Sequence, residues 1–422
     1  MSKKIRNTGR ACSGSIVFII LLFAAVSLAR AQSPAMIVSE QEAVRMALGR
    51  QDVVSLLQAT REGAQSDVIA AATWENPEFS YGHERSDSGP ERMTENSYTL
   101  AQTFDVSGQR GLKRKAALQR LQSTDLEIFQ WRLERAAEVR RVFYTLLYHQ
   151  QLHDLFENWR SGMERTESIM RRLMEAGDIS SYDLERLARE KALVEARERQ
   201  EHAEHERLTQ SLVALLGHPP VPGGDVAAAG SLLPGTPLPS LAQMLKQAEA
   251  HPGMQAMQSH IQAAALGKRL SERWRVPDIT LEAGFKEKQG ADEDTVFFGL
   301  SVPLPLFNRN DAEKLRAETE LTRLQNALHL ARTERAAQVT GLWRQAHDLA
   351  EAAQPLVADD ACLALVNKAD IAYRAGEIGV LELLDAYRNS FENRSQILSL
   401  MKEARLTRIE LDLLAGESTD EI

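Results

Sequence analysis

The chain repeats the same landmarks, in the same order, at an interval of about 200 residues. Pro77 and Pro277 each open a strand-like segment, and a second strand-like segment follows each of them. An Ala-Gly-acid-Ile element then occurs as Ala176–Ile179 and again as Ala375–Ile378. A shared helical composition is the alternative explanation, but the matches fall on Pro and Gly instead of on common helix formers. The sequence therefore predicts two copies of one folding unit.

Each copy contains a helical segment, then a pair of strands, then a long helical hairpin. For the first copy we expect the helical segment at Ser39–Trp74, strands at Glu78–Arg85 and Asn96–Asp105, and the hairpin at 107–216. For the second we expect Ser240–Arg275, then Asp278–Lys288 and Thr295–Leu304, and the hairpin at 308–414. The predicted divisions are a first repeat 32–218 with strand pair 78–105, a linker 219–239, a second repeat 240–416 with strand pair 278–304, and a tail 417–422.

The strands alternate between apolar and polar residues. Phe79 and Tyr81 share one face of the first strand, and Leu281 and Phe285 share one face of the third. This pattern fits a wall between lipid and water, and equally a half-buried antiparallel sheet in a soluble domain. Four strands cannot close a barrel, because small barrels need about eight. A barrel would therefore be shared, and three copies would supply about twelve strands, which predicts a homotrimer.

The helical hairpins are long. No proline occurs from Ser107 to Met174, a stretch of about 68 residues that would span on the order of 100 Å as one helix. The return helix is predicted at Ser181–Leu216. In the second copy Pro355 should kink or break the hairpin.

Sequence signals mark the joints between strands and helices and the tips of the hairpins. In the first joint, Gly108 permits a change of direction after the capping residues Asp105 and Ser107. In the second joint two prolines stop the strand and an asparagine is a natural N-cap: Pro303, Pro305 and Asn308. The predicted tips are Gly177 with Asp178, and Gly376 with Glu377.

The N-terminus resembles a signal peptide, here assigned to residues 1–31. A basic start precedes the apolar run Ile16–Leu28, and Ala29 and Ala31 supply the small residues of a cleavage site. An uncleaved anchor is the alternative. After removal of residues 1–31, 45 basic residues remain against 59 acidic ones, a formal net charge of −14. Such a chain should not bind nucleic acid.

Other chemical signals are weak. Cys362 is the single cysteine after residue 31, so no intrachain disulfide is expected. Pairs of histidines occur at helical spacing, but no third ligand for a metal is evident: His149, His153, His202 and His205. No catalytic carboxylate pair, nucleophile or phosphate loop is present, and we expect neither an enzyme nor a cofactor nor a resident metal.

Taken together, these stretches resemble the TolC-type outer-membrane efflux proteins, and most of all their cobalt–zinc–cadmium branch. The matching stretches are Asn76–Glu78, Leu100–Arg110, Leu300–Asn310 and the two tip elements. Arg110 closes the Ser-Gly-Gln-Arg motif. The resemblance covers essentially the whole chain after residue 31.

The resemblance implies a mainly helical fold with a small β part, assembled as a trimer with a twelve-stranded β-barrel and a twelve-helix α-barrel. It implies an outer-membrane location reaching into the periplasm, lipid around the barrel, and partners in a periplasmic adaptor protein and an inner-membrane pump that dock at the tips. It also places an acidic constriction at Glu382 and Asp385, with Asp183 in the matching part of the first repeat. Ile378 stands where a well-known relative has a basic residue.

The first expectation is thus a passive exit duct for metal cations or other small toxic compounds. A second is the exit channel of a type I protein secretion system. A third, of another class, is a periplasmic coiled-coil adaptor, against which the duplicated strand pairs argue.

Overall fold

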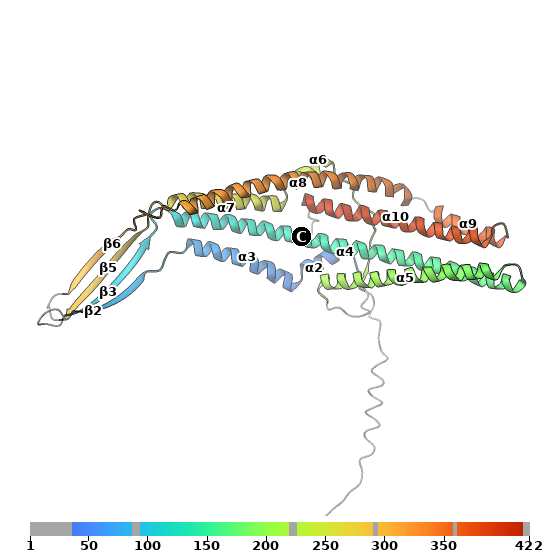
Figure 1. Cartoon of the computed structure of the whole chain (residues 1–422), viewed down its shortest axis with the longest axis horizontal. Helices are drawn as coiled ribbons and strands as arrows, with labels where there is room; N and C mark the ends of the chain where they lie inside the picture. The colour runs from blue at the N-terminus through green and yellow to red at the C-terminus, as the bar shows by residue number, and fades with distance from the viewer. Residues whose placement is uncertain (1–35, 87–92, 219–225, 290–293, 358–360, 417–422) are drawn as a thin grey trace, which may run out of the picture.

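The computed structural model describes residues 36–86, 93–218, 226–289, 294–357 and 361–416. Over these residues the chain is mainly helical and has a small β part, as expected. It is elongated, with a sheet at one end and two hairpin tips at the other (Figure 1). The expected signal peptide, the start of the linker and the tail lie outside the described residues.

The two halves of the chain have the same order of elements. The first half contains β1 (Met36–Val38), α2 (Glu40–Leu48), α3 (Gln51–Ala72), β2 (Glu78–Ser86), β3 (Met93–Phe104), α4 (Gln109–Ala176) and α5 (Ser181–Leu216). The second contains β4 (Val226–Ala228), α6 (Leu241–Glu249), α7 (Pro252–Arg273), β5 (Ile279–Gln289), β6 (Thr295–Ser301), α8 (Asp311–Val357), α9 (Ala361–Arg374) and α10 (Val380–Ala415). Each helical segment predicted before the strands is in fact two helices, divided near Gly49 and near His251.

The four long strands form one antiparallel sheet in the order β2-β3-β5-β6. The two halves meet at its centre, where Tyr98 pairs with Phe285 and Leu100 with Ala283. The strand β6 ends at Ser301, earlier than the predicted Leu304, because the prolines that follow cannot donate to the ladder. The sheet is open, with β2 and β6 as its edges.

One face of this sheet is apolar and uncovered within the described chain. Cross-strand pairing places Phe79 beside Leu100, and Leu281 beside Leu300. These side chains are exposed, up to 84% for Phe298. Uncovered apolar patches of this kind mark a surface that meets another molecule or lipid.

The long helices differ between the halves. The helix α4 runs unbroken for 68 residues, which corresponds to about 100 Å. In the second half α8 ends at Val357, soon after Pro355, and α9 begins at Ala361. Among the described residues, no helix has both the length and the apolar content needed to cross a membrane.

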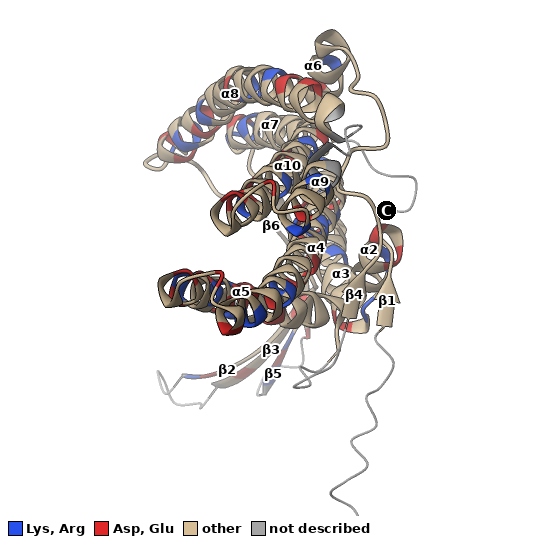
Figure 2. Cartoon of the chain, turned by 90° about the vertical axis from the view of Figure 1, so that its right-hand side faces the viewer, with Lys and Arg blue, Asp and Glu red and all other residues tan. Residues whose placement is uncertain are grey.

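Viewed end on, the helices follow an open curve, with α8 and α5 toward its two ends (Figure 2). The main core lies near the middle of the molecule, where Phe143 and Leu146 of α4 pack with Leu212 of α5. Beside this core the parallel pair β1–β4 ties the start of the first half to the start of the second. The tips are thus held at the far end of long, well-packed helices.

Candidate functional site at the hairpin tips

Both hairpins turn through a glycine in the left-handed conformation. Gly177 ends α4 with φ of 86°, and Gly376 follows α9 with φ of 76°. In each turn two backbone N–H groups bond back to the last helical carbonyls, as from Asp178 to Leu173 at 2.9 Å and from Glu377 to Ala372 at 2.9 Å. A residue with a Cβ atom would be strained there. The predicted tip residues therefore do form the tips.

The two return helices begin differently. At the start of α5, Ser180 and Asp183 form a reciprocal capping box, in which the Asp183 carboxylate accepts from the Ser180 hydroxyl at 2.8 Å. At the start of α10 the N-cap is Gly379, which makes no side-chain cap hydrogen bond. Glu382 occupies the position that corresponds to Asp183 in the repeat. Its carboxylate is consequently not engaged by a capping side chain.

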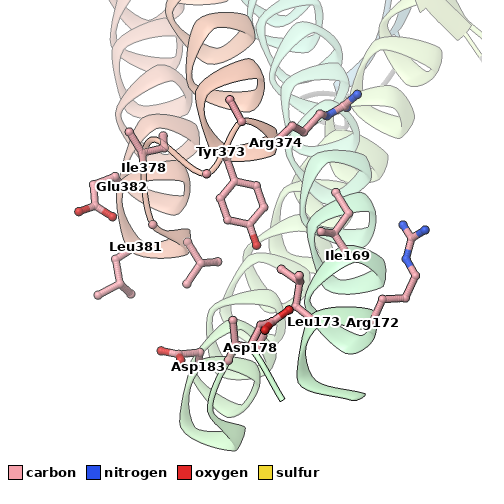
Figure 3. Close-up of a pocket in the computed structure, with 15 residues that line it drawn as sticks. Ile169, Arg172, Leu173, Asp178, Asp183, Tyr373, Arg374, Ile378, Leu381 and Glu382 are labelled. Carbon is pink, nitrogen blue, oxygen red and sulfur yellow. The ribbon is translucent and has the colours of Figure 1, made fainter. Parts of the chain in front are cut away.

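The two tips enclose a cavity of about 910 Å³ (Figure 3). Its lining combines apolar side chains of both hairpins with the carboxylates of Asp183 and Glu382. In Figure 3 these two carboxylates lie on one side of the cavity, and Arg172 and Arg374 lie on the other. Asp178 adds a third carboxylate to the lining, and Arg374 pairs with Asp370 outside it, at 2.6 Å.

Tyr373 of α9 points from the second tip toward the first (Figure 3). Its hydroxyl is buried and has no hydrogen-bond partner among the described residues. Burial raises the pKa of Tyr373, and the negative charge of Asp183 raises it further. Next to it an apolar layer joins the two hairpins through Met170, Leu187 and Leu384.

Asp385 lies one turn beyond Glu382 on α10 and does not line this cavity. Its side chain is 60% exposed, and its Oδ1 is 3.6 Å from Nη1 of Arg388. Arg388 also reaches α5, where its Nη2 donates to Oε1 of Glu190 at 2.6 Å. Tyr373, Glu190 and Arg388 are not among the residues that the sequence predicts for this site. For Arg388 alone the sequence contains a signal, because it follows Asp385 by three residues and such residues are neighbours on a helix.

The structure thus brings Asp178, Asp183, Gly376 and Glu382 to one cavity between the hairpins. A constriction made of Glu382, Asp385 and Asp183 requires several copies of the chain. The role of these residues remains a prediction.

The first strand-to-helix joint is built as predicted around Asp105 and Gly108. The Asp105 carboxylate accepts from the N–H groups of Gln109 at 3.0 Å and Arg110 at 2.6 Å, which caps α4. Gly108 has φ of 73°, as a sharp turn there requires. The Arg110 guanidinium lies 3.6 Å from the ring centroid of Trp74, which fixes the helix against the end of α3.

In the second joint the predicted cap is two residues too early. Asn308 does not cap α8, because its Oδ1 accepts from Asn310 N–H at 3.0 Å, ahead of the first helical residue Asp311. Asn310 occupies the cap position instead, with φ of 62°, and its amide donates to the Ser271 carbonyl at 3.1 Å. Asparagine tolerates this left-handed conformation better than most residues. Pro303 and Pro305 lie in the segment between β6 and this turn.

The four histidines lie together where α4 packs on α5. His149 Nδ1 is 2.8 Å from Oε2 of Glu201, and the rings of His153 and His202 are 6.4 Å apart. Burial lowers the pKa of His205, and the neighbouring histidines lower it further. Within the described ranges no three His, Cys, Asp or Glu side chains converge in a way that could hold a metal ion.

Two sequence relatives are proteins of metal resistance, whereas no family model matches the chain. The cobalt-zinc-cadmium resistance protein CzcC of Cupriavidus metallidurans is 24% identical over 318 residues, 74% of this chain and 75% of CzcC. The nickel-cobalt-cadmium resistance protein NccC of Alcaligenes xylosoxydans is 24% identical over 301 residues, 69% of this chain and 65% of NccC. The chain thus spans slightly less than two thirds of NccC. Neither relative is named as an enzyme, in keeping with the expectation from sequence.

Solved structures share the fold. The channel CusC superimposes with a TM-score of 0.75 at 16% identity, covering 90% of this chain and 92% of CusC. The outer membrane protein VceC of Vibrio cholerae gives a TM-score of 0.74 at 16% identity, covering 89% of this chain and 96% of VceC. The fold is therefore that of outer-membrane channels and not of a coiled-coil adaptor. The sequence relatives and the fold agree with the resemblance to the TolC-type outer-membrane efflux proteins that the motifs carry.

Proposed function

We propose that the chain forms the outer-membrane duct of a tripartite efflux pump, a passive path from the periplasm to the outside for metal cations or other small toxic compounds. The observation that carries the proposal is the pairing of an open sheet, apolar on one face, with an unbroken helix of 68 residues. The apolar face suits lipid. The helix suits a periplasmic tunnel.

The free edges of the sheet support a trimer. Each chain offers β2 at one edge and β6 at the other, with unpaired backbone groups on both. Joining β2 of one copy to β6 of the next removes every edge when the ring closes. Three copies supply twelve strands, a number within the range of closed membrane barrels. The open curve of the helices in Figure 2 is likewise suited to become one third of a helical tube.

The tips supply the periplasmic mouth of this duct. Threefold repetition of Glu382 and Asp385 places acidic rings at the constriction, with Asp183 of the first repeat beside them. Rings of carboxylates favour cations over anions in channels. The uncapped Glu382 is the best placed of the three residues, because no side chain of its own helix start holds it.

The duct needs partners, because the sequence contains no phosphate loop through which a nucleotide could supply energy. A periplasmic adaptor docked at Gly177, Asp178, Gly376 and Glu377 would open the mouth, and an inner-membrane pump would load it. The relatives named for metal resistance favour metal cations as cargo over a secreted polypeptide. Deletion of the gene should lower the metal concentration that the cell tolerates, and detergent extracts of the outer membrane should contain the protein as a particle of three chains. A monomer in the soluble periplasmic fraction would overturn the proposal.

The acidic mouth predicts a selectivity change. Replacing both Glu382→Ala and Asp385→Ala should reduce the cation-over-anion permeability ratio severalfold in planar-bilayer recordings, since six charges leave the mouth of a trimer. The matched control removes the same charge far from the tips, with Glu62→Ala and Asp67→Ala on the exposed face of α3. Unchanged selectivity in the mouth variant would remove these residues from the constriction.

A further inference from the structure

One cation at the tips is shared between two carboxylates on different helices. Arg388 of α10 donates from Nη2 and Nε to the same oxygen of Glu190 on α5, at 2.6 and 3.1 Å. Its remaining Nη1 lies 3.6 Å from Asp385, beyond normal hydrogen-bond length. The Glu190 hydrogen bond raises the pKa of Arg388 against the effect of burial, and Asp385 adds a smaller effect. Glu190 is therefore the preferred partner of the pair.

The contact is placed between apolar layers that fix its geometry. Both α5 and α10 begin at the tips and run in the same direction away from them (Figure 1). One turn nearer the tips, Leu187 packs with Leu384. One turn farther away, Val194 belongs to the layer that contains Tyr387. With 23% of the Glu190 side chain and 37% of the Arg388 side chain exposed, the pair is partly buried and is screened less by salt than a fully exposed pair.

The arrangement occurs in the second repeat alone. The positions of the first repeat that correspond to Asp385 and Arg388 are Arg186 and Arg189, and both are exposed. The acid next to the proposed mouth and the arginine one turn behind it are thus specific to α10. The first repeat therefore has no counterpart of the Asp385–Arg388 pair.

We infer that Arg388 determines the selectivity of the mouth, because Glu190 holds its guanidinium back from Asp385. While α5 and α10 are in contact, Arg388 neutralises Asp385 only in part, across 3.6 Å. When the two hairpins separate, Arg388 loses Glu190 and falls back on Asp385, whose charge it then neutralises. The inference rests on the proposed function and adds to it a link between helix separation and cation preference.

The test compares two single variants that break the same contact. Arg388→Gln should raise the cation-over-anion permeability ratio at least about twofold, because nothing then neutralises Asp385. Glu190→Gln should lower the ratio by a similar factor, because Arg388 is released toward Asp385. A contact that only ties the helices together would instead shift both variants in the same direction. Shifts in one direction, or none, would overturn the inference.

The double variant removes a remaining ambiguity. Glu190 carries a charge of its own, so its loss could weaken cation attraction without Arg388. In the Arg388→Gln background, Glu190→Gln should therefore leave the ratio unchanged. If it lowers the ratio as much as in the wild-type background, Glu190 acts directly and the inference fails. Arg388→Lys keeps the charge and should lie nearer the wild type than Arg388→Gln does.

A neighbouring ion pair gives the matched control. Lys191 follows Glu190 on α5 and pairs with Glu167 of α4 at 3.0 Å, within the same hairpin. Lys191→Gln and Glu167→Gln should leave the ratio within experimental error. The proposed function is tested separately, because it fails if the wild-type protein forms no conducting channel. If the wild type conducts and Glu382→Ala alters its selectivity, a null result at Arg388 counts against this inference alone.

Discussion

The two hairpins have the same order of elements, but their long helices and their tips differ in detail. The helix α4 spans 68 residues without a proline and contacts elements of both halves, whereas α8 of the second half contains Pro355 within its last turn. The second tip also lacks the capping box that Ser180 and Asp183 provide to the first. We therefore expect the first hairpin to be the stiffer support and the second hairpin to be the arm that moves more readily.

The same asymmetry occurs near the middle of the molecule, where the second helix of each half begins. His251 caps α7 by accepting from Gly253 N–H at 3.0 Å. Arg50, at the matching position before α3, makes no such cap and instead donates to carbonyls at the end of α5, including Ala214. Duplicated elements have thus kept their backbone path while their end contacts diverged.

Introducing a proline into α4 should produce the largest effect. Asp154 is exposed and lies next to the position that matches Pro355. Asp154→Pro removes one backbone hydrogen bond and forces a kink, at a cost of about 3 kcal/mol or more. Thermal unfolding of the purified protein, followed by circular dichroism, should show a clear loss of stability.

Two variants complete that experiment. Asp154→Ala should be close to neutral, and Pro355→Ala in α8 should change little. If Asp154→Pro does not lower the unfolding temperature, α4 accepts a proline as α8 does, and the expected difference in stiffness between the two hairpins is wrong.

Acid should affect the cap at His251, which has no titrating counterpart in the first half. Burial lowers the pKa of His251 from its ordinary value of 6.5 to about 4, and the nearby charge of Arg335 contributes. The folded protein thus resists a proton that the unfolded chain accepts. The stability contribution is complete above pH 6.5 and is lost as the pH falls toward 4, up to about 3 kcal/mol.

The variant His251→Asn can still cap α7 but cannot titrate. Its unfolding temperature should fall less than that of the wild type between pH 6.5 and pH 4. Parallel curves for the two proteins would show that His251 is not responsible for the acid sensitivity.

The smallest effects should come from exchanging the caps at the tips. Ser180→Ala should cost about 1 kcal/mol at the start of α5, and Gly379→Ser should gain a few tenths at the start of α10. Hydrogen exchange of the amides at 181–185 and 380–384 measures both changes locally. Equal exchange at the two tips of the wild-type protein would contradict the asymmetry before any variant is made.

Local features of the fold could be predicted from the sequence, because they depend on neighbouring residues. Gly177 and Gly376 turn the hairpins through left-handed backbone, and Asp105 caps α4, as their residue types require. The end of β6 was placed too late even though Pro303 lay in the sequence. The cap of α8 was assigned to Asn308, because two asparagines compete there and only the Ser271 carbonyl decides in favour of Asn310.

The contacts between the hairpins could not be predicted in this way. Glu190 and Arg388 meet because α5 and α10 both begin at the tips. Two residues that are 198 apart in sequence therefore lie at the same distance from the tips. The packing of Leu187 on Leu384 fixes how the two helices are aligned along their length. The spacing of residues in the sequence does not predict this alignment. The acidic residues of the proposed mouth were visible from the sequence, but the arginine that tunes them was not.

Because α4 is long, a small change of angle at the joint around Gly108 becomes a large displacement at the tip. The helix is stiff over about 100 Å, so it works as a lever arm. A tilt of about 2° at the strand end moves the tip by about 3 Å, roughly the difference between a salt bridge made and a salt bridge lost. The stacking of Arg110 on Trp74 is one of the contacts that set the tilt of α4 at this end. Substitutions at the joint of Gly108 and Arg110 should therefore alter the proposed mouth, although these residues do not contact it.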